Sequence, residues 1–387
     1  MAEHVTRKRR RKKQPTEYFF DYSMLFIVFF LLVFGLIMIY SASSYNAFEA
    51  YGDSTYYLKR QLIAVILGMF AMIVVANIPY RIWVRFATFG YGASVVLILM
   101  VLTPLGVESH GARRWIRLVK GFNLQPAEIS KIAMILFLAV LVCKMGKTVR
   151  TFKGFLIMIA TPLPIALLIW QVTDNLSSAI IVVGIAALMV FVASPDYKKF
   201  IIMGVGGAAG LFGLVSLLLA TSGGGFRGGR IRAWIDPESY AKDQGFQTLQ
   251  ALYAIGSGGV WGKGLGKSMQ KLSFLPESQN DMIFSIICEE LGLLGGIAII
   301  LMFVLLIWRM MIVANNAPDL FGAMLVVGVI GHIAIQAILN VAVVTNSIPN
   351  TGISLPFISY GGSSVTFLLG EIGLVLSVAK NIQLREN

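Results

Sequence analysis

The sequence predicts an all-α polytopic membrane protein with about ten transmembrane helices and a large extracellular loop between helices 7 and 8. Hydrophobic residues make up 57% of the 387 residues and charged residues only 13%, whereas a soluble domain carries about 25% charged residues. Apolar runs of the roughly 20 residues that cross a bilayer recur along the chain. Their length and uniform hydrophobicity exclude a β-barrel, whose strands alternate over about ten residues.

The first apolar run follows a basic N-terminal tail. Seven consecutive basic residues occupy Arg7 to Lys13, and such a flank holds a terminus on the cytoplasmic side and attracts anionic lipid. The run from Tyr22 to Tyr40 exceeds a signal-peptide core of about 7–15 residues, so we expect an uncleaved anchor helix. The net charge of +13 therefore indicates membrane lipids, and no nucleic acid, as partners.

Ten apolar segments are long enough to span a bilayer. In hydrocarbon, backbone N–H and C=O groups must pair within each segment, so each is expected to be a helix. An even number of crossings places both termini in the cytoplasm, together with basic residues such as Arg81 and Arg309. Nine or eleven crossings remain open, because Asp174 and Asn175 divide two short runs. The predicted spans are 22–42, 60–78, 86–105, 129–146, 154–172, 177–194, 200–220, 282–308, 320–346 and 357–379.

The predicted organisation is a cytoplasmic tail over residues 1–21, a transmembrane domain over 22–380 and a cytoplasmic C-terminal tail over 381–387. The extracytoplasmic loop 221–280 belongs to the transmembrane domain, and a second outside segment covers 106–128. Compact domains seldom keep long structureless loops unless those loops are functional. Both outside segments are therefore candidates for a site.

The loop 221–280 combines clustered glycines with cations. Closely approaching backbone amides and basic side chains are what phosphate binding requires, so one interpretation is a site for an anionic headgroup. The alternative is a flexible solvated loop whose cations touch phospholipid. The basic residues of this loop are Arg227, Arg230, Arg232, Lys242, Lys263, Lys267 and Lys271.

Two further clusters follow the third apolar run. Arg113, Arg114 and Trp115 have the composition of an interfacial anchor, which is the favoured interpretation, and they could also hold a substrate phosphate. Glu128 and Lys131 are three residues apart near the start of the next helix, so they share a face and can pair. A local ion pair and a pocket role both remain open for them.

Asp281 stands immediately before an apolar helix. It could cap that helix, or it could be a general base at the boundary between water and lipid. Glu289 and Glu290 follow about two turns deeper, where an acid needs a cavity or a partner. The three acids point in different directions around a helix of about 100° per residue, so at least one glutamate is expected to be structural.

The segment 348–364 is rich in glycine, proline and hydroxyl groups and precedes the last helix. It could be an irregular re-entrant segment, whose polar backbone must line protein or water, or a helix-capping turn. His332 lies in an apolar run without a second metal ligand at useful spacing, so we expect a packed core histidine.

At these residues the chain resembles the SEDS family (shape, elongation, division and sporulation) of bacterial peptidoglycan glycosyltransferases. The resemblance covers Tyr22 to Ala379, and the stretch 264–271 is more similar to the FtsW and sporulation branch than to RodA. The matching motifs are Gly111-Ala-Arg-Arg-Trp-Ile116, Gln125-Pro-Ala-Glu-Ile-Ser-Lys131, Gly245-Phe-Gln-Thr-Leu-Gln250, Ala254-Ile-Gly-Ser-Gly-Gly259, Gly262-Lys-Gly-Leu-Gly266, Leu275-Pro-Glu277 through Asp281, Glu289-Glu-Leu-Gly292 and Pro356-Phe-Ile-Ser-Tyr-Gly-Gly-Ser-Ser364.

The resemblance implies polymerisation of lipid II, a disaccharide-pentapeptide on undecaprenyl pyrophosphate, into β-1,4 glycan strands at the outer face of the bacterial cytoplasmic membrane. Asp281 would be the catalytic base. Arg114, Lys267 and Lys271 would stabilise the departing pyrophosphate, and Glu128 and Lys131 would line the same cavity. A divalent cation on the pyrophosphate would suit this chemistry, but the sequence contains no dedicated metal cage. A class B penicillin-binding transpeptidase and division-complex proteins are the expected partners.

Two other function classes remain open from the sequence. A lipid II flippase would also need many helices and intramembrane acids. A non-catalytic division scaffold would need the helices alone. Polymer formation from lipid II distinguishes the enzyme from both.

Overall fold

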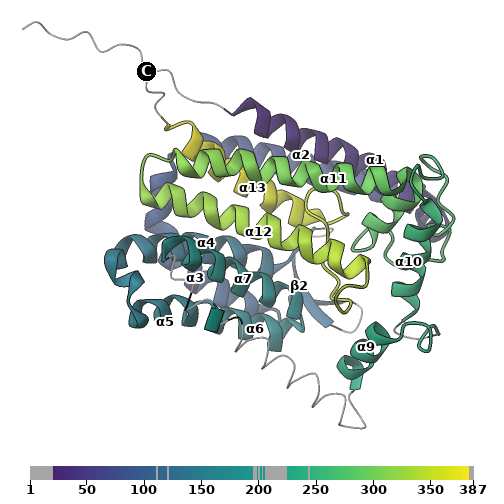
Figure 1. Ribbon diagram of the computed structural model, residues 1–387, viewed down its shortest axis with the longest axis horizontal. Coiled ribbons are helices and arrows are strands. Elements are labelled where there is room, and N and C mark those ends of the chain that lie inside the picture. Colours follow the sequence, from purple (N-terminus) through teal and green to yellow (C-terminus); the bar gives the residue numbers. More distant parts are fainter. Residues whose placement is uncertain are drawn as a thin grey trace, which may run out of the picture.

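The computed structural model describes residues 21–109, 112–119, 122–194, 198, 201, 202, 204, 225–242 and 245–382. Long helices form a bundle, and α9 and α10 lie at one end of it (Figure 1). The helices are α1 (Tyr22–Tyr51), α2 (Tyr56–Asn77), α3 (Trp83–Met100), α4 (Pro126–Met145), α5 (Phe152–Ala160), α6 (Leu163–Thr173), α7 (Leu176–Ala193), α9 (Gly225–Ile235), α10 (Phe246–Gly258), α11 (Ile283–Asn315), α12 (Leu320–Val344) and α13 (Gly362–Ala379), with the 3₁₀ turns η1 (Tyr80–Ile82) and η2 (Gly146–Arg150).

Within the described ranges, nine helical segments are long and apolar enough to cross a membrane. This confirms the prediction of an α-helical, multi-pass membrane protein. α5 and α6 together make one span, Phe152–Thr173, and Pro162 separates them. The third span begins at Tyr80, six residues before its predicted start. The predicted span 200–220 lies outside the described residues, apart from 201, 202 and 204.

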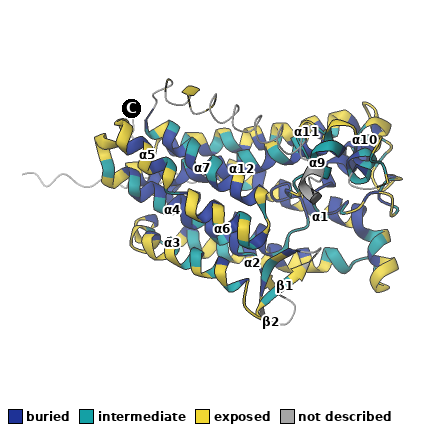
Figure 2. Ribbon diagram, turned by 90° about the horizontal axis from the view of Figure 1, so that it is seen from below, coloured by how far each residue is buried: buried dark blue, intermediate teal, exposed yellow. Residues whose placement is uncertain are grey.

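Burial differs strongly between the helices. In the most apolar stretch of each span, the share of buried residues is 78% for α13 and 67% for α12, but only 17% for the span that contains α3. α12 and α13 are therefore central, and α3 is peripheral. Large apolar side chains such as Phe26, Phe70 and Phe89 are exposed. In Figure 2 the exposed residues lie on the outward faces of the helices, as expected for surfaces that meet lipid.

A three-stranded antiparallel sheet is the exception to the predicted all-helical fold. It consists of β1 (Gly106–Ser109), β2 (Ala112–Val119) and β3 (Phe122–Leu124), in the order β1-β2-β3. Ala112 and Ile116 of β2 are buried, whereas Arg113 and Arg117 are exposed. This alternation is the period of a strand with one buried face.

Two ion-paired clusters mark the end of the bundle opposite α10, which we call the far end. Arg309 donates from Nε and Nη2 to the Asp21 carboxylate, at 3.2 and 2.9 Å. Asp21 also accepts from the first turn of α1, so it caps that helix. Asp319, which immediately precedes α12, accepts from the Tyr80 hydroxyl group at 2.8 Å and from Arg81 Nε at 2.9 Å. The opposite end, which carries Asp281, is the site end.

α11 is broken at Gly292, where φ is 69° and ψ is −171°. The chain that follows α10 lies along this break and pairs with its freed backbone groups. The N–H groups of Lys263 and Gly264 donate to the carbonyls of Glu289 and Glu290, at 3.0 and 2.9 Å. The loop therefore satisfies the polar backbone that the break exposes, which a membrane protein requires.

The break also changes the expected depth of the glutamates. α11 and α12 pack against each other and are joined by the short connection 316–319. At a rise of about 1.5 Å per residue, Gly292 lies ~35 Å along α11 from this connection and Asn340 ~30 Å along α12. Because Asn340 binds the backbone of Asp281, Glu290 lies no deeper in the bundle than Asp281. The expectation that both acids lie about two turns deeper than Asp281 is therefore wrong.

Gly292→Ala is expected to destabilise the protein. A Cβ at Gly292 would lie 2.3 Å from the carbonyl oxygen of Val260, and its backbone conformation is almost exclusive to glycine, which together cost at least about 1–3 kcal/mol. Thermal unfolding in detergent measures the effect. Gly256→Ala in α10 is the matched control, because no atom lies within 4 Å of that Cβ and a helix favours alanine. Equal unfolding temperatures for the two variants would contradict the expectation.

Candidate active site

Asp281 lies at the site end, in the irregular segment that leads into α11. The helix begins at Ile283, and Met282 is its N-cap residue, with no side-chain capping bond. The capping interpretation of Asp281 is therefore not supported. The residue is 9% exposed, and its Oδ2 would lie 3.7 Å from a Cβ at Gly352. The carboxylate thus faces a glycine of the segment that precedes α13.

That segment, residues 345–361, is irregular and dips into the bundle. A Cβ at Gly35 of α1 would lie only 2.8 Å from Cα of Ile358, and Gly35 is ~9 Å further from the site end than Ser41. Its backbone finds polar partners at several points, including Gln61, which accepts from Gly361 N at 3.2 Å and donates to Ser359 O at 3.3 Å. The structure therefore agrees with the re-entrant interpretation.

One face of α12 connects this segment to the rest of the site. His332, Gln336 and Asn340 are four residues apart, so they lie above one another on the helix. The Asn340 amide donates to Asp281 O at 2.8 Å and to Ile353 O at 2.6 Å. The Gln336 amide donates to Ser354 O at 3.1 Å. This face therefore holds both the segment of Asp281 and the re-entrant segment.

The predicted pair of Glu128 and Lys131 forms in α4 and is buried. Lys131 Nζ lies 2.9 Å from Glu128 Oε1, and the two side chains are 2% and 6% exposed. Lys131 also donates to Gln336 at 3.3 Å, and Ser364 donates to Glu128 at 3.3 Å. The structure thus places this pair one turn of α12 away from the asparagine that holds Asp281.

His332 has more polar surroundings than the predicted core histidine. Its Nδ1 lies 2.8 Å from the Glu371 carboxylate and its Nε2 lies 2.9 Å from Gln336 Oε1. Because Gln336 donates to Ser354, its Oε1 accepts, and Nε2 of His332 must carry a proton. The spacing of four along α12 was the sequence signal for this network, which sequence reasoning missed.

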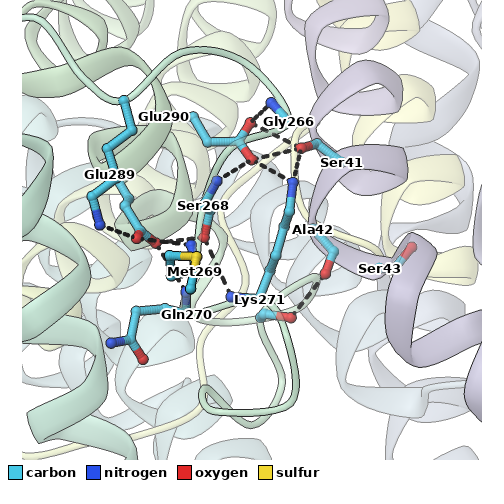
Figure 3. A network of polar contacts seen from close by, with 12 residues as sticks. Ser41, Ala42, Ser43, Gly266, Ser268, Met269, Gln270, Lys271, Glu289 and Glu290 are labelled. Atoms are coloured by element: carbon cyan, nitrogen blue, oxygen red, sulfur yellow. Dashed lines mark hydrogen bonds and ion pairs between the residues drawn. The ribbon is translucent and has the colours of Figure 1, made fainter.

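Glu289 and Glu290 anchor the glycine-rich loop (Figure 3). Glu290 accepts from Lys271 Nζ at 2.9 Å and from Ser41 at 2.7 Å. Glu289 accepts from Lys263 Nζ at 2.7 Å. The backbone amides of the loop also donate to these two carboxylates, namely Gly266 and Ser268 to Glu290, and Met269 and Gln270 to Glu289. The amides and cations predicted to cradle a phosphate therefore bind the protein's own carboxylates.

The other predicted cations have different surroundings. Lys271 is 6% exposed, and its ion pair with Glu290 differs from the predicted contact with pyrophosphate. Arg114 donates to the carbonyls of Thr173 and Asp174 at the end of α6, at 3.3 and 2.9 Å. Lys267 is exposed and makes no ion pair with any residue that the structure describes. Of these cations, Lys267 has the most freedom to meet a ligand.

A cation that sequence reasoning missed adjoins the same segments. Arg60 of α2 lies 4.6 Å from the centre of the Tyr56 ring, and its positive charge acts on the Tyr360 phenol. Tyr360 N donates to Gln279 O at 2.9 Å, two residues before Asp281. Burial raises the pKa of Tyr360, and Arg60 offsets part of the shift. The phenol therefore stays protonated at neutral pH.

Buried polar atoms without a protein partner surround Asp281. Among the described residues, Asn280 Oδ1, Asn340 Oδ1 and Thr351 Oγ1 have none. Each can form a further hydrogen bond with water or with a polar ligand. No group of three or more His, Cys, Asp or Glu in the described ranges could hold a metal ion. The arrangement is that of a carboxylate among polar groups, which can accept a proton from a hydroxyl group.

Comparison with known proteins agrees with this geometry. The family model of FtsW, RodA and SpoVE, described as "Cell cycle protein", matches residues 22–384. Stage V sporulation protein E of Bacillus subtilis is 40% identical, over 93% of this chain and 97% of the relative. A probable peptidoglycan glycosyltransferase FtsW of Trichlorobacter lovleyi is 39% identical, over 94% of each chain.

A solved structure has the same fold. It is described as the structural coordination of polymerization and crosslinking by a peptidoglycan synthase complex. The match has a TM-score of 0.75 and 25% sequence identity, and it covers 94% of this chain and 98% of the other. The similarity therefore extends over the whole bundle, including the end that carries Asp281.

Proposed function

The chain belongs to the cell cycle protein family of FtsW, RodA and SpoVE, and we propose that it is a peptidoglycan glycosyltransferase that polymerises lipid II into β-1,4 glycan strands. The relatives named as glycosyltransferases support the enzyme class. One observation carries the choice of site: Asp281 lies beside the re-entrant segment, one turn of α12 from the buried pair of Glu128 and Lys131. We place the site end at the outer face of the cytoplasmic membrane, and both termini in the cytoplasm.

In the proposed reaction, Asp281 accepts the proton of the 4-hydroxyl group of the acceptor sugar. The hydroxyl oxygen then forms a bond to C1 of the donor sugar. The bond between C1 and the pyrophosphate oxygen breaks, and undecaprenyl pyrophosphate leaves with the electron pair. One displacement converts the α-linked donor into a β-linked product, so the reaction needs no covalent enzyme intermediate.

The departing pyrophosphate needs positive charge, which Lys267 and Arg114 are proposed to supply. Lys267 is exposed on the loop beside α11. Arg114 uses Nε and Nη2 for the end of α6, so a substrate would meet its remaining N–H groups. Glu128 and Lys131 would line the cavity as a fixed pair. We leave Lys271 out of the substrate contacts, because Glu290 and Ser41 already hold its ammonium group.

Purified protein supplied with labelled lipid II tests the proposal. A glycosyltransferase produces glycan chains, whose lengths gel electrophoresis resolves. A flippase would move lipid II across a vesicle membrane without forming polymer, and a scaffold would do neither. Absence of chains with the purified protein, both alone and with its partner, would refute the enzyme class.

The structural neighbour in a synthase complex supports a partner that crosslinks glycan strands. We propose a class B penicillin-binding transpeptidase for that role, within a division complex. Co-purification of the two proteins, and a rise in polymerisation when the transpeptidase is added, would support the pairing.

Lys267→Ala is expected to lower kcat/KM for lipid II about 10-fold, mainly through loss of charge beside the pyrophosphate. Lys267→Arg should retain most of the activity, because it keeps the charge. Lys242→Ala, which removes another exposed lysine of the same loop, is the matched control and should have little effect. Equal activity of the Lys267→Ala and Lys242→Ala variants would exclude Lys267 from the site.

A further inference from the structure

The side chain of Asn340 joins the two segments that flank the proposed catalytic carboxylate. Its amide donates to Asp281 O at 2.8 Å and to Ile353 O at 2.6 Å. Both partners are carbonyl oxygens, which only accept, so the NH₂ group must point toward them and the amide orientation is determined. Asn340 is fully buried, where hydrogen bonds are strong and a lost one is costly.

The Asp281 carbonyl lies outside the regular hydrogen bonding of α11, because the helix begins two residues later. The neighbouring backbone of this segment is held at other points, by Tyr360 N on Gln279 O and by Ser278 Oγ on Ala42 O. Asn340 therefore supplies the bond at the residue that carries the proposed base.

The second hydrogen bond of Asn340 holds the re-entrant segment, which faces the Asp281 carboxylate. Ile353 follows Gly352, and a Cβ at Gly352 would lie 3.7 Å from Asp281 Oδ2. The single Asn340 amide thus fixes the position of the Asp281 backbone and also that of the segment that the Asp281 carboxylate faces. One turn along α12, Gln336 repeats the arrangement, because it binds Ser354 O and accepts from Lys131.

From this geometry we propose that Asn340 is a positioning residue, which aligns the Asp281 carboxylate with the acceptor hydroxyl. The inference rests on the proposed function, in which Asp281 is the base. Misplacement of a catalytic group by about 1 Å can lower the rate about 100-fold. Asn340 itself touches no reacting atom, so its loss should lower kcat and leave KM for lipid II nearly unchanged.

Steady-state lipid II polymerisation by the full-length protein tests the proposal. Asn340→Ala removes both bonds and should lower kcat about 10- to 100-fold, with KM within about twofold of wild type. Asn340→Ser keeps a small donor that can reach one carbonyl at a time, so it should lose less. Both variants should also shift the pH dependence of kcat, because the carboxylate changes its surroundings. A merely structural role would lower activity only in proportion to the folded fraction, with an unchanged pH profile.

The matched control is Asn346→Gly. Asn346 also bridges two segments, but its bonds are to Trp234 rather than to the backbone of Asp281, and glycine suits its positive φ of 55°. This variant should keep wild-type kcat. The double variant of Asp281→Asn with Asn340→Ala should be no slower than Asp281→Asn alone, because Asn340 acts through the carboxylate.

The outcomes separate the inference from the proposed function. If folded Asn340→Ala protein polymerises lipid II within twofold of the wild-type kcat, the positioning role is refuted while the enzyme class stands. Additive losses in the double variant would also refute it. If the wild-type protein forms no polymer, the proposed function fails, and the positioning role fails with it.

Discussion

Asp281→Asn is expected to lower lipid II polymerisation by at least about 100-fold, because a positioned general base contributes about 100- to 10,000-fold to a rate. Asparagine has nearly the shape of aspartate, and the Asp281 carbonyl would still accept from Asn340. The fold should therefore persist while the proton acceptor is lost. Glycan chain formation measures the activity, and thermal unfolding in detergent measures the fold.

Glu238→Gln provides the matched control for this experiment. Glu238 is an exposed acid in the segment between α9 and α10, so its neutralisation should leave polymerisation unchanged. Near-normal chain formation by Asp281→Asn would show that the base assignment is wrong, even if the enzyme class holds. If Asp281→Asn loses both activity and folding, Asp281→Glu tests the base assignment instead. That variant should fold and should lose activity because its carboxylate is misplaced.

Glu290→Ala is expected to lower the free energy of unfolding by about 3–5 kcal/mol, because it leaves the buried ammonium group of Lys271 without its carboxylate. The Lys271 side chain is 8% exposed and that of Glu290 is fully buried. Replacement of both residues by leucine should cost less than the sum of the single changes, since an apolar pair leaves no buried charge. Denaturant and thermal unfolding in mild detergent check both expectations.

The exposed pair of Lys59 and Asp53, with side chains 66% and 40% exposed, supplies the control. Lys59→Met should change the unfolding temperature little, because solvent screens such a pair. Lys271→Met distinguishes the two roles considered for Lys271. Wild-type stability with a large loss of turnover would favour the predicted contact with pyrophosphate over the structural role seen in the fold.

The local sequence was sufficient to predict the membrane-spanning helices. Nine of the predicted segments are membrane-length helices in the described structure, because hydrocarbon forces each apolar run to satisfy its own backbone. The pairing of Glu128 with Lys131 was also a local property, since residues three apart on a helix face each other.

The partners of the charged groups could not be predicted from the local sequence. The glycine-rich loop has the composition of an anion site, and its anions are Glu289 and Glu290 of its own chain. Nothing local predicts this, because it depends on the break at Gly292, which brings the loop against α11. Likewise, Glu371 and His332 each look isolated in an apolar run until α12 and α13 pack together.

The sequence by itself thus determined the class of protein, the membrane spans and the acidic residue proposed as the base, because hydropathy and motifs act over short stretches of chain. Tertiary structure alone decided which cations remain available to bind a substrate. Lys131, Lys271 and Arg114 have partners on other elements, whereas Lys267 is exposed. It also decided that Asn340 holds Asp281. The physical reason is that a buried polar group must find a partner, and packing between distant segments determines which one it meets.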